Sequence, residues 1–417
     1  MSVGFAARQL LQLGFTANAL RPLRSGRAAI PAFVGGWLTS ELSPHLAGLT
    51  AVDVATHLGR TDRLDRADVI GIAAAGLNLA GFVRLFAGGR QAAAEIEHAL
   101  VEALGPDYRS AIVRAPRPDD EHAALTALAM PFRMHDVDVV ARRRLAYAPG
   151  GRRFELDVFH HRDTPSNAPV LLQIHGGAWV LGTKDTQAIP LMLHMAARGW
   201  VCVSVNYPLS PRNRWPEHLV AVKRAMQWIQ EHGAEYGADP SFVAVTGGSA
   251  GGHLAAMMAL TADDKSLQPG FEDVDTAVQA CVPHYGVYDF TAESGTRSSA
   301  YRLESLLRPY VMATDARYPE DYRAASPLYR ITPEAPPFLI VHGTNDTLVP
   351  IGEARAFVDR LRSASEQPVA YAEISGAQHA FDIFPSVRSA GVLRGVARFL
   401  EWTHDTREAR LTTSPQR

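Results

Sequence analysis

The chain contains only two cysteines among its 417 residues, Cys202 and Cys281, and both lie in apolar, strand-like runs. Such scarcity excludes a disulfide framework, and these positions favour buried free thiols over a disulfide or a metal site. The chain also lacks a His-Glu-x-x-His or Cys-x-x-Cys pair, so we expect no metal and no cofactor. Long basic runs are missing too, and the net charge is −2, which argues against a nucleic-acid partner.

No uncharged run in the helix-rich first hundred residues reaches the roughly 20 residues that a membrane-spanning helix needs. The longest examples are residues 28–40 and the 15 residues 69–83. Between them lie Glu41, His45 and Asp53, which would be costly in lipid. Three arginines that suit a membrane surface precede the first run, namely Arg21, Arg24 and Arg27.

Two interpretations of this N-terminal helical region, residues 1–105, therefore stay open. It is either a set of helices packed as a cap on a catalytic unit or a peripheral membrane-associated segment. Arg8 interrupts the first apolar stretch and no clean cleavage site follows a long apolar region, so we expect no signal peptide. The expected location is cytoplasmic, with membrane association and a homodimer both left open.

The texture changes after a Pro- and Asp-containing connector at residues 106–133. Over residues 134–405 strands and helices alternate, with helices predicted at 191–197 and 219–231, and a polar, frayed tail is expected at 406–417. Such alternation predicts an α/β fold with a mainly parallel sheet and helices on both faces. The predicted strands are 137–140 with 144–147, 154–159, 170–174, 201–205, 242–245, 278–283, 338–341 and 370–374.

A Gly-x-Ser-x-Gly turn places Ser249 between the strand 242–245 and a helical stretch that begins at His253. Small residues two before and two after the serine let strand and helix approach closely, so that the hydroxyl points out of the sheet. Glycine-rich turns also bind phosphates, but the strand-turn-helix context favours a nucleophile.

Asp346 and His379 each follow a late predicted strand, which is the chain order of acid and base in a doubly wound hydrolase sheet. A serine hydroxyl needs a base to take its proton and a carboxylate to orient that base. The alternative interpretations are that Asp346 only forms a turn and that His379 is a surface loop histidine. Other candidates are worse placed, namely His342 before its turn, His253 within a helix, and Asp382 too close to His379 to orient its ring.

An oxyanion loop is predicted at Gly176, Gly177 and Ala178, directly after the strand 170–174. The amides of Gly177, Ala178 and Ala250 are the expected donors, with Gly176 allowing the turn. Alanine still donates through its amide but restricts φ relative to glycine. The preceding histidine is expected to organise the loop, and the tryptophan that follows is equally suited to a pocket wall and to the core.

These motifs together resemble the hormone-sensitive-lipase-like branch of the α/β-hydrolases, including actinobacterial esterases and lipases. The resemblance runs from Val170 to the histidine loop and includes Asn206–Pro211, a turn that is buried and structural in that family. It implies an eight-stranded α/β-hydrolase fold and a helical cap, made by the N-terminal helices and an insertion at about residues 286–329. The arginines of that insertion (Arg308, Arg317 and Arg323) are expected to be solvated or ion-paired.

The sequence departs from the family pattern at three positions. These differences leave the predicted triad roles unchanged but weaken the inference of the substrate class from the resemblance. Ala178 replaces a glycine, Gly248 stands where the family usually has an acid, and Asn206 stands where it has aspartate. The sequence therefore predicts a carboxylic ester hydrolase acting on a small ester or lipid through an acyl-enzyme intermediate. An arylformamidase-like amide hydrolase, suggested by Trp179, and a non-catalytic binding module are the alternatives.

Overall fold

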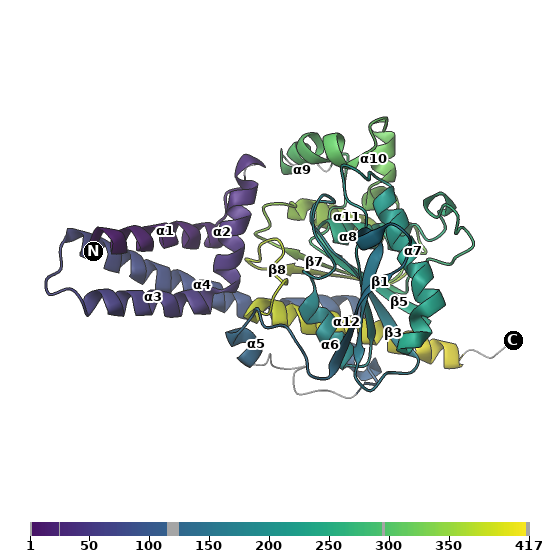
Figure 1. The fold of residues 1–417 in the computed structure, drawn as a ribbon, viewed down its shortest axis with the longest axis horizontal. Coiled ribbons are helices and arrows are strands. Elements are labelled where there is room, and N and C mark those ends of the chain that lie inside the picture. Colours follow the sequence, from purple (N-terminus) through teal and green to yellow (C-terminus); the bar gives the residue numbers. More distant parts are fainter. Residues whose placement is uncertain (1, 25, 115–124, 294–296, 414–417) are drawn as a thin grey trace.

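The computed structural model describes residues 2–24, 26–114, 125–293 and 297–413. A central sheet is flanked by helices, and a bundle of N-terminal helices projects from one side as an arm (Figure 1). Most of the Pro- and Asp-containing stretch in the predicted connector, and residues 414–417 of the predicted tail, lie outside the described residues.

The predicted mainly parallel sheet is confirmed, with eight strands in the described part of the chain. Their spatial order is β1-β2-β4-β3-β5-β6-β7-β8. The pairs β1–β2 and β2–β4 are antiparallel, and all later pairs are parallel. The strands are β1 (Val139–Ala146), β2 (Glu155–His161), β3 (Ala168–Ile174), β4 (Val201–Val205), β5 (Ala238–Gly248), β6 (Ala280–His284), β7 (Phe338–Gly343) and β8 (Val369–Ile374).

The central strands, such as β3, are buried throughout because helices cover both faces of this sheet. One face packs on α7, α8 and α11, and the other on α6, α12 and the second half of α4. The two predicted helices correspond to α6 and α7. The bounds are α4 (Arg66–Leu104), α6 (Ile189–Ala197), α7 (Glu217–His232), α8 (Ala250–Leu260), α11 (Ile351–Ala364) and α12 (Val387–Thr413).

The prediction of a frayed tail from residue 406 is wrong as far as Thr413, because α12 continues to that residue. The Thr406 hydroxyl donates to the carbonyl of Trp402 at 2.6 Å, which is an ordinary helical contact. Asp405 also accepts from the backbone N–H of Val113 at 2.7 Å. The last turns of α12 are thus held by a segment some three hundred residues earlier in the chain.

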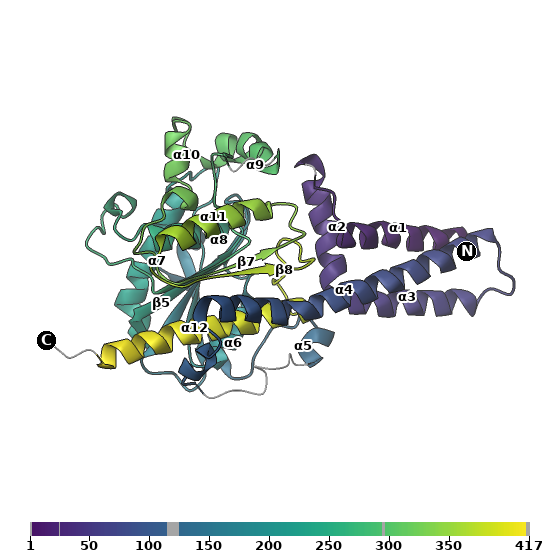
Figure 2. The same ribbon diagram turned by 180° about the vertical axis from the view of Figure 1, so that it is seen from behind.

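The arm consists of α1 (Ser2–Leu20), α3 (Ser43–Leu58) and the first half of α4, which lie side by side in Figures 1 and 2. A capping box of Asp65 and Asp68 begins α4. By length and hydropathy, α4 is the one helix of the described residues that could cross a membrane, and 39% of its most apolar window is buried. Its second half packs on α12 and β8, so one helix belongs to both arm and sheet.

Helix α2 (Ala29–Glu41) crosses the base of the arm next to the sheet (Figure 1). Opposite it lies the insertion at residues 286–329, which contains α9 (Arg297–Arg302), a π-helix (Leu303–Val311) and α10 (Glu320–Ala324). A short 3₁₀ turn before α2 contacts α9, and a side chain at Gly26 would meet the ring of Tyr301. The N-terminal region and the insertion therefore approach each other at the carboxyl end of the sheet.

Candidate active site

Ser249 occupies the turn between β5 and α8 with φ +59° and ψ −119°, a conformation that side chains rarely adopt. Its neighbours must be small. A Cβ on Gly247 would lie 2.5 Å from the carbonyl of Gly251, and one on Gly251 would lie 2.1 Å from the Ile174 oxygen. The Ser249 N–H donates to the His284 carbonyl at 2.9 Å. The elbow predicted from the glycine spacing is therefore present, tied to the strands on either side.

Asp346 and His379, predicted from separate loops, lie together. His379 Nδ1 is 2.7 Å from Asp346 Oδ2, and both side chains are buried. The other oxygen, Oδ1, accepts from the backbone N–H groups of Leu348 at 2.9 Å and Val349 at 2.8 Å. The backbone thus fixes Oδ1, which leaves Oδ2 directed at the imidazole, and this is the arrangement that orients a base.

His342, which sequence position disfavoured, also contacts this carboxylate. Its Nε2 lies 3.4 Å from Asp346 Oδ2 and 3.0 Å from the Val349 carbonyl. Burial opposes ionisation of Asp346, but His379 and His342, by charge and hydrogen bonding, hold the pKa of this carboxyl well below its usual range. The acid is therefore ionised at neutral pH.

Ser249 Oγ makes no hydrogen bond to any residue that the structure describes, His379 included. Tyr285 nonetheless lies next to both His379 and the residue that precedes Ser249. Its ring centroid is 4.6 Å from that of His379, and its hydroxyl lies 2.8 Å from where a Cβ on Gly248 would be. Serine–base hydrogen bonds often tighten only when substrate is bound, so this geometry is compatible with a triad.

The oxyanion loop packs against the elbow, since a Cβ on Gly176 would lie 3.1 Å from the Ser249 Cβ. Gly176 N–H donates to Gln187 Oε1 at 2.6 Å, so this amide is engaged. The amides of Gly177, Ala178 and Ala250 have no acceptor among the described residues. These three are the amides predicted as donors, and Gly176 shapes the turn.

The backbone of this loop is strained. Gly177 has φ +121° and Ala178 has φ +54°, followed by Trp179 at +60°. Ala178 therefore adopts the left-handed region, which is unfavourable for a residue with a Cβ and costs about 1–2 kcal/mol. Strain of this kind persists only where the surroundings impose it, and it clusters at functional sites.

His175 organises the loop, as expected from its position. Its Nδ1 lies 2.7 Å from the Gly176 carbonyl, and its ring stacks on Tyr207 at 4.3 Å. Burial lowers the pKa of His175 to about 4, so the ring is neutral at physiological pH. Asn206, at the head of the 206–211 turn, accepts from the Lys184 amide at 2.7 Å, so the turn is structural and mostly buried, although Pro211 is exposed.

Trp179 belongs to the core, where its Nε1–H donates to His253 Nδ1 at 3.3 Å. The insertion arginines are ion-paired, with Arg323 2.7 Å from Glu293 and Arg317 3.4 Å from Asp321. Cys202 and Cys281 are buried and unpaired, as predicted. Among the described residues, no group of three His, Cys, Asp or Glu side chains could hold a metal.

The resemblance implied that N-terminal helices form part of a cap, but it did not indicate which of their residues contact the site. Phe33 presents its ring edge to His379 at 5.9 Å, and the Thr347 hydroxyl donates to the Ala29 carbonyl at 2.9 Å. Arg24 donates to the Thr344 carbonyl at 2.9 Å. No local motif signals these contacts, because they join residues more than three hundred positions apart.

The chain is similar to known esterases over most of its length. It is 43% identical over 411 residues to LipM of Mycobacterium tuberculosis, named a probable carboxylic ester hydrolase, with 94% of this chain and 92% of LipM covered. The chain belongs to the α/β-hydrolase family of carboxylic ester hydrolases. Esterase LipQ of the same organism is 44% identical over 325 residues, covering 74% of this esterase and 75% of LipQ.

The BD-FAE family model matches residues 156–361 of this esterase. Solved structures support the same fold. Esterase B from Lactobacillus rhamnosis, bound to a tributyrin phosphonate, aligns with a TM-score of 0.54 at 18% identity, covering 66% of this chain and 89% of that one. A truncated carbohydrate esterase from gut microbiota aligns with a TM-score of 0.51 at 20% identity, covering 63% and 96%.

Proposed function

We propose that this esterase cleaves carboxylic esters through an acyl-enzyme intermediate on Ser249. The observation that carries the proposal is the buried Asp346–His379 pair, joined at 2.7 Å beside the strained Ser249 elbow. Two members of the triad are already preorganised, and the third is displayed on a turn that has no other structural need for a serine hydroxyl.

In the first step His379 Nε2 takes the Ser249 proton while Oγ attacks the carbonyl carbon of the ester. The resulting oxyanion accepts hydrogen bonds from the amides of Gly177, Ala178 and Ala250, of which the last begins helix α8. His379 then protonates the leaving alkoxide, and the alcohol departs. Asp346 keeps Nδ1 protonated, so that Nε2 is the basic atom.

In the second step a water molecule attacks the acyl carbon and gives its proton to His379. The oxyanion forms again and collapses, and the carboxylic acid leaves as the Ser249 hydroxyl regains the proton. Every role falls on a group of this chain, and no metal or cofactor is needed in the scheme.

Hydrolysis of p-nitrophenyl esters from acetate to palmitate, with wild type and Ser249→Ala side by side, tests this proposal. We expect kcat to fall about 10⁵- to 10⁶-fold in the variant. Full activity of Ser249→Ala would overturn it. The acyl length of the wild-type optimum separates a closed acyl pocket beneath α2 and the insertion from one open to long chains.

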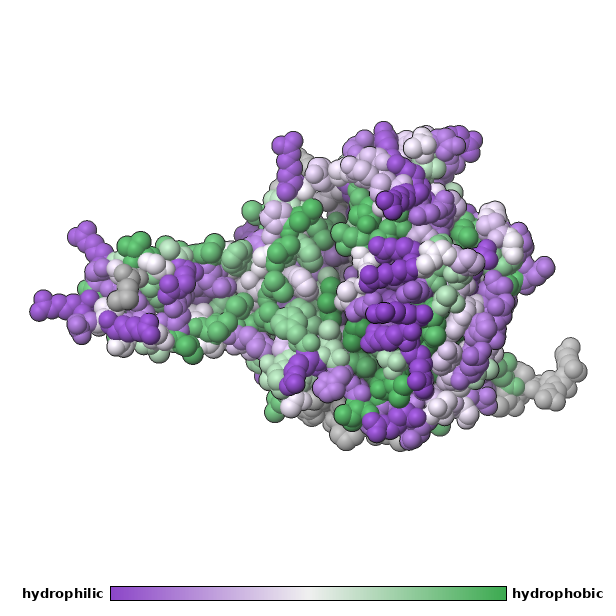
Figure 3. All heavy atoms as spheres, in the orientation of Figure 1, coloured by the Kyte–Doolittle hydropathy of each residue, from purple (hydrophilic) through white to green (hydrophobic). Residues whose placement is uncertain are grey.

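We also propose that the projecting arm docks on a lipid surface. Large apolar side chains lie exposed along all three arm helices, and Figure 3 shows them as apolar patches on the visible face of the arm. Nine of them are between 48% and 73% exposed, namely Val3, Leu10, Leu11, Leu49, Val52, Val69, Ile70, Leu77 and Val83. Arg60, Arg63 and Arg66 at the exposed tip outnumber Asp62 and Asp65 there, and this excess of positive charge suits anionic headgroups.

Co-sedimentation of the full chain with vesicles of phosphatidylcholine and phosphatidylglycerol tests the docking. Replacing Val69, Leu77 and Val83 together with serine removes about 1 kcal/mol of apolar transfer each, so we expect about hundredfold weaker binding. Val137→Ser is the matched control, because Val137 is 69% exposed but lies outside the arm. Equal binding of both variants, or no binding by wild type, would overturn the proposal, and a concentration-dependent dimer would point to a second copy instead.

A further inference from the structure

Tyr285 directly follows β6 and lies against the imidazole of His379, at a ring-centroid distance of 4.6 Å and an interplanar angle of 56°. Its backbone has φ +37°, which is a rare conformation for a bulky side chain. Its N–H donates to the Val341 carbonyl at 2.7 Å, and the side chain is buried. The surrounding structure therefore imposes the position of this ring at some cost in backbone strain.

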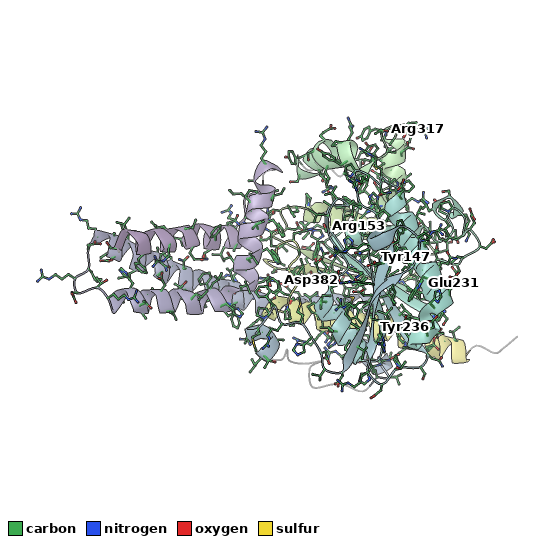
Figure 4. All side chains as sticks on the ribbon, in the orientation of Figure 1. Tyr147, Arg153, Glu231, Tyr236, Arg317 and Asp382 are labelled. Atoms are coloured by element: carbon green, nitrogen blue, oxygen red, sulfur yellow. The ribbon has the colours of Figure 1, made fainter. Side chains whose placement is uncertain are left out.

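The Tyr285 hydroxyl donates to Asp382, three residues after His379. Asp382 lies near the junction between the arm and the sheet (Figure 4), and its second oxygen is 2.8 Å from His284 Nδ1. Burial opposes ionisation of Asp382, but His284 and Tyr285 hold the pKa of this carboxyl below its usual value. An ionised carboxylate with two partners fixes the tyrosine hydroxyl more firmly than a neutral acceptor would.

Gly248 provides the space that Tyr285 fills. A Cβ at this position would come within 2.8 Å of both Cε2 and the hydroxyl oxygen of Tyr285, closer than real Cβ contacts. The glycine before the nucleophile, a departure from the resembled family, therefore has a physical reason. Position 248 and Tyr285 are a matched pair, and a side chain at the first would displace the ring of the second.

We propose that Tyr285 and Asp382 are positioning residues for His379, and this rests on the proposed role of His379 as the base. Asp346 holds the imidazole at Nδ1, but one hydrogen bond leaves the ring free to tilt about that contact. The Tyr285 ring limits this tilt, and Asp382 fixes the Tyr285 ring through its hydroxyl. Nε2 is thereby kept directed at Ser249, where a small misalignment would slow proton transfer.

Tyr285→Phe and Asp382→Asn, both nearly isosteric, test the proposal with p-nitrophenyl acetate. Tyr285→Phe removes the hydrogen bond and Asp382→Asn removes the negative charge that strengthens it, so we expect kcat to fall about tenfold in the first and by no more than that in the second, with little change in KM. The double variant should fall no further than Tyr285→Phe alone, because both changes act through one contact. A merely structural role would instead lower the unfolding temperature without this split between kcat and KM.

Tyr288→Phe is the control, because Tyr288 is a fully buried tyrosine three residues along whose ring stacks on Phe357 at 4.4 Å. It should keep wild-type kcat. If Asp382→Asn does not fold, Tyr285→Phe alone decides. A kcat for Tyr285→Phe within about twofold of wild type, a rise in KM at constant kcat, or additive losses would overturn the inference.

Ser249→Ala distinguishes the two levels of the argument. An active Ser249→Ala removes the proposed function and with it the role of His379. An inactive Ser249→Ala together with wild-type behaviour of Tyr285→Phe and Asp382→Asn overturns only the positioning role of Tyr285 and Asp382.

Discussion

The arm and the sheet follow opposite packing rules. In the sheet region, large apolar side chains lie inside, in two clusters on the two faces of the sheet. In the arm, helices meet at small residues, since a Cβ on Gly71 would lie 2.6 Å from the Phe5 ring and one on Gly81 2.3 Å from Thr16. Buried Asn78 accepts from the Thr16 hydroxyl at 2.9 Å. Phe5, Phe82 and Leu85 are buried in the arm, but most of its other large apolar side chains face outward.

Small residues and interhelical hydrogen bonds at the contacts, with apolar side chains outside, are typical of helices that pack in lipid. A water-soluble bundle shows the reverse pattern. The difference supports the proposed lipid docking of the arm. It also shows that one helix, α4, can change its packing partners along its length, from small arm residues to the apolar layer beneath β8.

The largest expected effect lies in the catalytic half. Asp346→Asn keeps the shape of the side chain but favours the wrong imidazole tautomer, so kcat should fall about 10⁴-fold with the fold intact. Steady-state kinetics on a short p-nitrophenyl ester and a thermal unfolding curve measure both. A fall below about tenfold would transfer the acid role to another carboxylate.

The seam between the two regions offers the next largest effect. Glu41 at the end of α2 pairs with Arg388 of α12 at 2.9 Å, and both side chains are almost fully buried. Glu41→Gln leaves the guanidinium charge buried without a counter-charge, which should cost about 3–5 kcal/mol of unfolding free energy. Denaturant titration measures the loss.

Arg317→Gln is the control for the seam, since Arg317 forms an exposed pair with Asp321 on the insertion. It should cost less than about 1 kcal/mol. A cost for Glu41→Gln no larger than this would mean that the Glu41–Arg388 pair contributes little, and that the other contacts, such as the Asn345 side chain donating to the Ala19 carbonyl at 3.1 Å, hold the N-terminal helices to the sheet.

Acidic pH should weaken the sheet region through its buried neutral histidines. Burial lowers the pKa of His253 to about 3. In the folded protein Trp179 donates to its Nδ1, and its Nε2–H donates to the Ala325 carbonyl. In the unfolded chain His253 binds a proton below about pH 6.5, whereas in the folded protein it stays neutral. Its contribution to the unfolding free energy is therefore full above that pH and is lost as pH falls toward 3. Between pH 7 and 5 the loss is about 2 kcal/mol.

His253→Gln keeps a donor and an acceptor but does not titrate. Its unfolding free energy should therefore fall about 2 kcal/mol less than that of wild type between pH 7 and 5. Parallel pH curves for the two proteins would contradict this assignment.

The smallest effect is expected at Ala178. Glycine relieves the left-handed strain but adds unfolded-state entropy, so Ala178→Gly should change the unfolding free energy by less than about 1 kcal/mol. The amide donor persists, so kcat should stay within about twofold. A large loss of kcat would mean that the methyl group, and not only the amide, shapes the oxyanion loop.

The sequence alone predicted all eight strands and the close approach of Asp346 and His379, because periodicity and strand–loop order are local signals. It could not predict that Gln187 engages the Gly176 amide, that α2 contacts the triad loops, or that α12 extends to Thr413. Asp382 was set aside for its closeness to His379, yet it acts on a different neighbour, Tyr285. These features depend on packing between distant segments, which composition and spacing do not encode.

The Glu41–Arg388 seam joins residues 347 positions apart, and this has a consequence for synthesis. The arm and α2 are made before the sheet, whereas α12, which pairs with α2 through this contact, is made after it. During elongation, the apolar surfaces of α1, α3 and α4 are exposed before the sheet that fixes their base has formed. Incomplete chains with such exposed surfaces tend to aggregate. An early encounter with lipid would shelter those surfaces while the rest of the chain is made.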